Sequence, residues 1–169
     1  MMYDRDLYKF RLERDGLDRR LGSGFPKGSI VVVHGPYGSG KSAIVQRLCY
    51  GFLKNDHTVT YISTELTTKG FIDQMYSLDY PIVDYLLNKK LLFIPVYPLI
   101  GKPRKRDDFL LRLMSSKQLF EREITIIDTF SNLAKTNLDE EACLEALSFF
   151  KKLAGIGKCI ILTIETGEL

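Results

Sequence analysis

Short runs of apolar residues alternate with amphipathic stretches along most of the chain. Runs of four to eight apolar or β-branched residues between turn signals are typical of strands buried in a parallel sheet. The first such run, Ile30–Val33, lies between Gly28 and Gly35, and we expect its strand to be buried on both faces. The pattern predicts four further strands: Thr58–Ser63, Leu91–Pro95, Ile124–Ile127 and Cys159–Leu162.

Helical periodicity fills the segments between these strands. A helix is expected over Ser42–Lys54, with an apolar face of Ile44, Val45, Leu48 and Phe52. The other expected helices run over Thr68–Tyr76, from Pro81 to Lys90, from Asp107 or Asp108 to Phe120, and from Asp139 to Gly155. Strands that alternate with helices predict a three-layer α/β fold with a mainly parallel, twisted sheet. In such folds ligands bind beyond the carboxyl ends of the strands.

Composition narrows the class of protein without identifying it. A chain of 169 residues, 45% hydrophobic and 27% charged, predicts a single globular domain. Its net charge of +3 is too small to indicate a general affinity for polyanions, which argues against nucleic acid as a partner. No apolar run approaches the ~20 residues that cross a bilayer, and the charged N-terminus lacks a targeting signal. We therefore expect a cytoplasmic protein.

Cysteine spacing excludes two further classes of site. Cys49, Cys143 and Cys159 are odd in number and far apart, and none forms a C-x-x-C pair. This spacing argues against a disulfide framework and against a zinc site. We expect all three to be small buried apolar residues.

A phosphate-binding loop follows the first predicted strand. The sequence matches G-x-x-x-x-G-K-[ST] at Gly35, Pro36, Tyr37, Gly38, Ser39, Gly40, Lys41 and Ser42. Glycines let successive backbone N–H groups point at a phosphate, and the start of the following helix adds partial positive charge. In this arrangement Lys41 would reach the β- and γ-phosphates of a nucleotide, and Ser42 would bind the bridging Mg²⁺.

Acidic residues at other strand ends are candidates for the rest of the site. Asp128 ends the fourth strand and would hold Mg²⁺ with Ser42, the alternative being a helix cap or turn residue. Glu65 ends the second strand and would polarise an attacking water as a catalytic base, the alternative being a cap for the next helix. Thr163 and Glu165 could sense the γ-phosphate, although a plain strand end is the simpler interpretation.

Four cations gather in the loop after the third strand, at Lys102, Arg104, Lys105 and Arg106. Such a cluster can clamp phosphates as a kinase lid does, follow a nucleic-acid backbone, or dock on an acidic partner or an anionic lipid. Simple solvation of the loop is the fourth interpretation, and the sequence leaves all four open.

The segments around the phosphate loop carry a family resemblance. Gly16–Ser29 resembles the LD..LGGG.P.GS approach to the loop in the KaiC branch of the RecA superfamily. Gln46–Leu53 and Val59–Thr68 resemble, more narrowly, the FlaH family, the KaiC-like ATP-binding components of the archaellum (archaeal flagellum) motor. The resemblance covers roughly residues 15–165, with the Ser-Thr-x-Leu-Thr-Thr stretch as its most telling part.

This resemblance implies a RecA-like P-loop NTPase core that binds ATP and Mg²⁺ through Lys41, Ser42 and Asp128. It also implies a hexameric ring that docks onto the archaellar secretion/rotation ATPase, beside a membrane platform protein at the inner face of the cell membrane. Nucleotide occupancy would act as a regulatory switch, with hydrolysis weak or absent and dependent on Glu65. Because RecA-like proteins continue beyond a fifth strand, the resemblance further implies that residues 1–169 form one domain that lacks its C-terminal strands.

Two alternative functions are compatible with the same residues. A RecA- or RadA-like ATPase acting on single-stranded DNA would show DNA-stimulated hydrolysis with a steep salt dependence. A small-molecule kinase would use residues 101–106 as its lid, but the sequence offers no signature for an acceptor.

Overall fold

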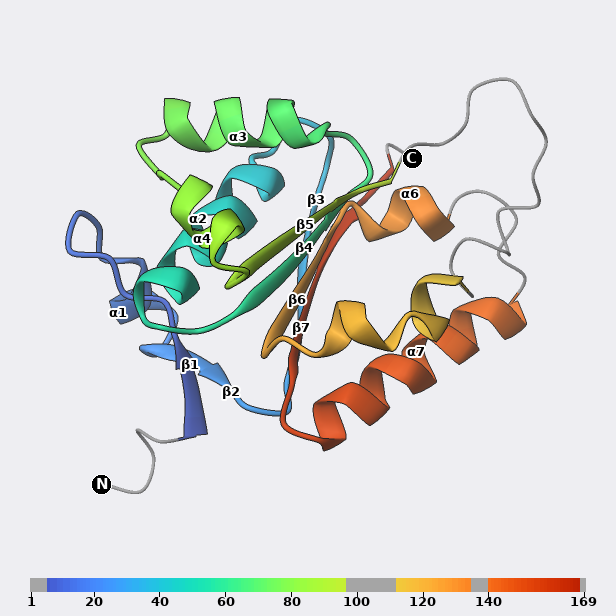
Figure 1. Cartoon of the computed structure of the whole chain (residues 1–169). Helices are drawn as coiled ribbons and strands as arrows, with labels where there is room; N and C mark the ends of the chain where they lie inside the picture. Colours follow the sequence, from blue (N-terminus) through green and yellow to red (C-terminus); the bar gives the residue numbers. More distant parts are fainter. Residues whose placement is uncertain (1–5, 97–111, 135–139, 168–169) are drawn as a thin grey trace.

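The computed structural model describes residues 6–96, 112–134 and 140–167. Its elements alternate strands with helices along the chain, as the sequence pattern predicts (Figure 1). In chain order they are β1 (Leu7–Lys9), α1 (Leu17–Arg20), β2 (Gly24–Pro26), β3 (Ile30–Gly35), α2 (Lys41–Lys54), β4 (Val59–Ser63), α3 (Thr68–Ser77), α4 (Val83–Leu87), β5 (Leu91–Pro95), a 3₁₀ helix (Lys117–Phe120), β6 (Ile124–Asp128), α6 (Phe130–Ala134), α7 (Glu140–Gly155) and β7 (Cys159–Glu165).

Five parallel strands form the central sheet in the order β3-β7-β6-β4-β5. The register pairs Val33 with Thr163 and Ser63 with Asp128, so the strands end close to one another at one edge. Figure 1 shows α2, α3 and α4 on one face of this sheet and α6 and α7 on the other. The three-layer, mainly parallel α/β fold predicted from the sequence is confirmed.

Strand β3 is the main correction to the strand predictions. Ile30 and Val32 are 36% and 48% exposed, and only the alternate residues Val31 and Val33 pack against the core beside α2. The prediction of a strand buried on both faces is therefore wrong. The physical reason is position, because β3 is an edge strand of the described sheet, and the alternate side chains Ile30 and Val32 are left partly uncovered there.

Helix α2 fills the layer on one face of the sheet. Val45, Leu48 and Phe52 are buried as predicted, in a core shared with Tyr61, Phe71 and other residues of β4, α3 and β5. Ile44 differs from the prediction because it is 43% exposed. Successive helical residues are turned by about 100°, so Ile44 lies at the flank of the helix rather than on the sheet-facing stripe.

A second core lies on the opposite face, under α7. Phe150 and Leu153 of this helix pack there with Ile160 and Leu162 of β7. Leu144 and Leu147, which the helical spacing assigns to the same helix, are 63% and 44% exposed. The sheet is thus covered on both faces, as a three-layer fold requires.

Helix boundaries differ from the predictions in three places. The helix expected from Pro81 to Lys90 covers only Val83–Leu87. The helix expected to run to Phe120 is interrupted: residues 112–115 are helical, and a separate 3₁₀ turn covers Lys117–Phe120. Asp107, Asp108 and Asp139, the expected first residues of two helices, lie outside the described residues.

The N-terminal segment forms a small hairpin that the sequence pattern did not reveal. β1 and β2 pair antiparallel, with Tyr8 opposite Phe25. The guanidinium of Arg47, from the middle of α2, binds the carbonyl of Phe10 at 2.6 Å and both carboxylate oxygens of Asp15 at 2.7 and 2.8 Å. Gly51 lies beside this contact, because a Cβ there would collide with the backbone of Phe10.

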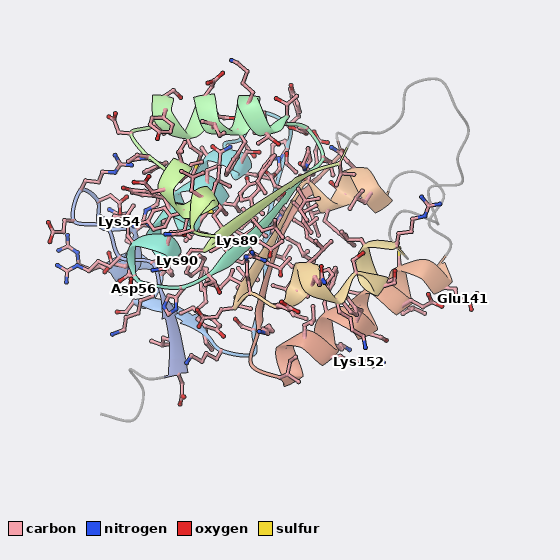
Figure 2. The ribbon with its side chains drawn as sticks, in the orientation of Figure 1. Lys54, Asp56, Lys89, Lys90, Glu141 and Lys152 are labelled. Carbon is pink, nitrogen blue, oxygen red and sulfur yellow. The ribbon has the colours of Figure 1, made fainter. Side chains whose placement is uncertain are left out.

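Some charged side chains lie near the end of α2 and the start of β5, away from the carboxyl edge of the sheet (Figure 2). Figure 2 labels Lys54, Asp56, Lys89 and Lys90 near the end of α2 and the start of β5. Lys90 Nζ lies 3.7 Å from Asp56 Oδ1, a partly exposed pair that contributes little to stability.

Among the described helices, none has the length and apolar character needed to span a bilayer.

Candidate functional site

The candidate site lies at the carboxyl edge of the sheet, where four strands deliver polar residues. The phosphate loop follows β3, Ser63 ends β4 with Glu65 two residues later, Asp128 ends β6, and Thr163 lies near the end of β7. Parallel strands bring their carboxyl ends to one edge, which is where a ligand was expected. The basic cluster of residues 102–106 lies outside the described residues.

The phosphate loop is held in a compact form by its own lysine. Lys41 Nζ donates to the carbonyl of Pro36 at 2.8 Å and approaches Ser39 Oγ at 3.5 Å. Gly38 and Gly40 have φ of 75° and 90°, in the left-handed region that L side chains rarely adopt. The glycines of the sequence motif are therefore required at these two positions by the backbone.

Asp128 is the centre of a cluster of hydroxyl groups. Its carboxylate is 4% exposed, and Oδ1 accepts hydrogen bonds from Ser42 Oγ at 3.2 Å and Thr163 Oγ1 at 2.8 Å. The other oxygen, Oδ2, accepts from the Tyr61 hydroxyl at 2.7 Å. The structure therefore brings Ser42 and Asp128 together as predicted.

Tyr61 is a site residue that sequence reasoning missed. Its side chain is fully buried in β4, and burial together with the neighbouring Asp128 carboxylate raises the pKa of the phenol well above its usual value. The hydroxyl consequently stays protonated and donates to Asp128. A signal was present, since a tyrosine within a buried strand needs a polar partner for its hydroxyl, but the partner lies 67 residues away.

Glu65 is exposed beside the cluster and held by a residue from α6. Asn132 Nδ2 donates to Glu65 Oε1 at 3.3 Å and to Thr64 Oγ1 at 3.2 Å. The alternative role of Glu65 as a helix cap is wrong, because Thr67 is the N-cap of α3 and its side chain accepts from the Gly70 N–H at 2.8 Å. Asn132 is a second residue near the site to which sequence spacing gave no role.

Thr163 and Glu165 have different surroundings in β7. Thr163 is fully buried, and its hydroxyl donates to Asp128 Oδ1 at 2.8 Å. The backbone N–H of Glu165 donates to Ser131 Oγ at 2.9 Å, which ties the end of β7 to α6.

The donor atoms suit a hard divalent cation. Mg²⁺ prefers oxygen ligands and is commonly held by one or two protein groups together with substrate phosphates and water. The Ser42 hydroxyl and the Asp128 carboxylate provide such oxygens side by side. The described residues contain no group of three or more His, Cys, Asp or Glu that could hold a metal alone.

Cys49 and Cys159 are buried as expected, while Cys143 is only half-buried.

Comparison with known proteins places this geometry in a family. A family model described as "ATPase: KaiC" matches residues 14–168. The archaeal flagellar ATP-binding protein FlaH of Methanocaldococcus jannaschii is 43% identical over 164 residues, which cover 97% of this chain and 70% of that protein. The chain belongs to the FlaH family of KaiC-like ATPases.

Two further FlaH comparisons agree. The FlaH protein of Methanococcus voltae is 43% identical over 161 residues, covering 95% of this chain and 70% of its own length. The crystal structure of flagellar accessory protein FlaH from Methanocaldococcus jannaschii matches with a TM-score of 0.89 and 44% identity, over 96% of this chain and 72% of that one. The predicted family and RecA-like fold are confirmed.

Proposed function

We propose that this chain is the ATP-binding component of the archaellum motor and assembly complex, and that it binds ATP with Mg²⁺ at the phosphate loop. The observation that carries this proposal is the contact between Ser42 and Asp128 at 3.2 Å, beneath an intact phosphate loop. The names of the FlaH relatives support the ATP and the archaeal flagellum parts of the proposal.

Each site residue has a distinct task in this proposal. The backbone N–H groups of residues 37–42 would surround the phosphates, and Lys41 would exchange its contact with the Pro36 carbonyl for the β- and γ-phosphates. Ser42 and Asp128 hold Mg²⁺, which when bound offsets the phosphate charge. Tyr61 and Thr163 fix the Asp128 carboxylate while this happens.

Glu65 is the proposed catalytic residue for any hydrolysis. It lies two residues after β4, the strand whose last residue pairs with Asp128, and a carboxylate there could polarise a water aimed at the γ-phosphate. Its contact with Asn132 gives the carboxylate a competing partner. A carboxylate held by Asn132 is less available to polarise water, so hydrolysis would be slow. In that case the signal would be whether nucleotide is bound, rather than how fast it is hydrolysed.

The proposed consequence of occupancy is a regulatory switch on the motor. The chain would assemble as a hexameric ring, dock on the archaellar secretion/rotation ATPase beside the membrane platform protein, and lie at the inner face of the cell membrane. The FlaH names support association with the archaellum machinery in general. The individual partners and the ring are our proposal.

Titration calorimetry tests the binding step. Wild type should bind ATP in the presence of Mg²⁺, and Lys41→Ala should weaken binding at least tenfold because a charge-assisted contact to phosphate is lost (roughly 1.5–3 kcal/mol). Lys54→Ala is the matched control, since Lys54 is an exposed lysine at the other end of α2. Equal affinities for the three proteins would refute the proposed phosphate site.

A pull-down with the motor ATPase tests the switch. We expect the amount of captured ATPase to differ between ATP-bound and nucleotide-free protein, and the difference to vanish in Lys41→Ala. Capture that ignores nucleotide would contradict the switch while leaving ATP binding intact. Hydrolysis that rises on addition of single-stranded DNA would instead support the RecA- or RadA-like alternative.

A further inference from the structure

A buried glutamine of α2 has no role in the site described above. Gln46 is fully buried, and neither Oε1 nor Nε2 of its side-chain amide has a hydrogen-bond partner among the described residues. Leaving the polar groups of a buried side chain unpaired costs free energy, and such groups are rare in native proteins. Close to a functional site, this cost is explained if the amide gains a partner in another state of the protein.

Gln46 lies beside the hydroxyl cluster around Asp128. It comes four residues after Ser42 in α2, about one helical turn, so both side chains lie on the side of the helix that faces the sheet. Burial and the Asp128 carboxylate raise the pKa of the Tyr61 phenol, and the Gln46 amide opposes this rise. The amide is therefore a neighbour of the phenol, although the two groups are not at hydrogen-bond geometry.

The Tyr61 hydroxyl can accept a further hydrogen bond. Its proton is donated to Asp128 Oδ2 at 2.7 Å, and a hydroxyl oxygen has lone pairs that accept from other donors. The Nε2 atom of Gln46 carries two N–H donors. A bond from Gln46 to Tyr61 would form a chain that runs from Gln46 through Tyr61 to Asp128, and hydrogen bonds in such a chain strengthen one another.

Cation binding changes what α2 supplies to the Asp128 carboxylate. In the structure, α2 contacts this carboxylate through the Ser42 hydroxyl, which donates to Oδ1 at 3.2 Å. In the proposed function the Ser42 oxygen binds Mg²⁺, so this donated bond is weakened, and Tyr61 and Thr163 of the sheet remain as donors. The terminal torsion of a glutamine side chain is soft, so a small rotation of Gln46 would restore a contact from α2 one turn further along the helix.

We propose that Gln46 is a positioning residue for Mg²⁺: with Mg-ATP bound, its amide donates to the Tyr61 hydroxyl and so holds the Asp128 carboxylate. The proposal rests on the proposed function and adds a residue that supports its metal site. The amide is unpaired in the described structure and gains its partner on binding. Its contribution therefore favours the ligand-bound form over the free form.

Gln46→Met separates this role from packing, because methionine has a similar length and shape but no amide. We expect the melting temperature of the variant without ligand to rise by about 2–4 °C, since an unpaired buried amide is removed. The Mg²⁺ concentration that half-saturates ATP binding should nevertheless rise about three- to tenfold, while affinity for ATP in EDTA stays within about twofold of wild type. Gln118→Met, at an exposed glutamine of the 3₁₀ helix, is the matched control.

Nuclear magnetic resonance of wild type gives a second measurement that needs no variant. The side-chain amide protons of Gln46, assigned by through-bond experiments, should move downfield and exchange more slowly with solvent when Mg-ATP is added. ATP with EDTA should leave them unchanged. Amide protons that stay in place on addition of Mg-ATP would overturn the proposal, even if Gln46→Met fails to fold.

The outcomes are distinguishable from failure of the proposed function. A Gln46→Met protein at least as stable as wild type, with a raised Mg²⁺ requirement, supports the proposal. An unchanged Mg²⁺ requirement would make Gln46 a packing residue and refute the proposal, while binding that depends on Lys41 stands. A less stable variant, or one that loses affinity equally with Mg²⁺ and with EDTA, would refute it too, because the free protein would then already need the amide. If wild type binds no Mg-ATP, the proposed function itself fails.

Discussion

Asp128 shows how hydroxyl groups on neighbouring strands orient a buried carboxylate. Tyr61 and Thr163 engage one oxygen each, from the strands on either side of β6. The carboxylate is therefore fixed before any ligand arrives, and only Ser42 needs to change partners when a cation binds.

Tyr61→Phe tests this positioning role. We expect the Mg²⁺ concentration that half-saturates ATP binding to rise about three- to tenfold, since one hydrogen bond to a charged group is lost (roughly 1.5 kcal/mol at most in this indirect position). Titration of Mg²⁺ at fixed ATP measures the change. Tyr76→Phe, at a tyrosine that is 47% exposed on α3, serves as control. An unchanged Mg²⁺ requirement in Tyr61→Phe would show that the hydroxyl matters only for folding.

Sequence spacing predicts some residues of the site and not others. The phosphate loop is a continuous motif, and Asp128 ends an apolar run, so both can be found without a structure. Tyr61 and Thr163 belong to the site only because the β4–β6–β7 register places them beside Asp128. Asn132 depends likewise on the short helix α6 after β6. Contacts set by register between distant segments leave no local signal.

At the scale of elements, the central strands of the sheet can be predicted from the sequence, whereas the burial of the edge strand β3 and the presence of β1 and β2 cannot. The central strands are buried throughout and appear as continuous apolar runs. β1 and β2 have three residues each, too few for any periodicity to show. β3 appears in the sequence as a fully buried strand, because its apolar pattern cannot reveal which neighbours flank it. The predicted site residues lie at one edge of the sheet because they depend on strand ends rather than on strand order.

His57 joins the N-terminal hairpin to the body of the protein. Its Nε2 accepts a hydrogen bond from the Lys9 N–H at 3.1 Å, and its ring meets Tyr8 edge to face at 5.2 Å. Burial lowers the pKa of His57 below its usual value, opposed in part by the Glu123 carboxylate near Nδ1. The neutral ring is therefore the form that the folded chain prefers.

This preference predicts a pH dependence of stability. The unfolded chain takes up the histidine proton first as pH falls, so the contribution of His57 is present above about pH 6.5 and is lost as pH falls through the lower folded-state pKa. We expect the melting temperature to drop by roughly 2–4 °C more in wild type than in His57→Gln between pH 7.5 and pH 5, the shift that about 1 kcal/mol gives at this size.

His34→Gln is the control for this measurement. His34 is the other histidine of the chain and is exposed in β3. Melting curves of His34→Gln that follow wild type, while those of His57→Gln flatten, would support the assignment. The same pH profile in wild type and His57→Gln would contradict it.

At the scale of the whole molecule, two apolar cores on opposite faces of one sheet support the fold. The larger core, beside α2 and α3, stacks the rings of Tyr61, Phe71 and Phe93 with centroids 4.3 to 5.9 Å apart. The core under α7 packs Phe150 against Phe130. We therefore expect the loss of unfolding free energy caused by a side-chain truncation to be large in the central strands and small in β3.

A pair of identical substitutions measures this decline. Ile126→Val, in the fully buried middle of β6, should lower the free energy of unfolding by about 0.5–1.5 kcal/mol, the usual cost of one buried methylene. Ile30→Val, at a 36% exposed position of β3, should cost less than about 0.5 kcal/mol. Urea unfolding of both variants gives the two values. Equal costs would mean that the outer face of β3 is covered in solution.

Arg47 sets a lower limit on the unit that can be produced as a folded protein. Its guanidinium is buried within α2, and its partners, the Phe10 carbonyl and the Asp15 carboxylate, both come from the N-terminal segment. A shortened chain that starts after residue 15 would lose both acceptors of this guanidinium and the Phe10 ring beside it, and would expose the flank of α2 to water. Expression of the nucleotide-binding core by itself therefore has to start upstream of Phe10, because Tyr8, Phe10 and Asp15 pack against α2 or bind its arginine.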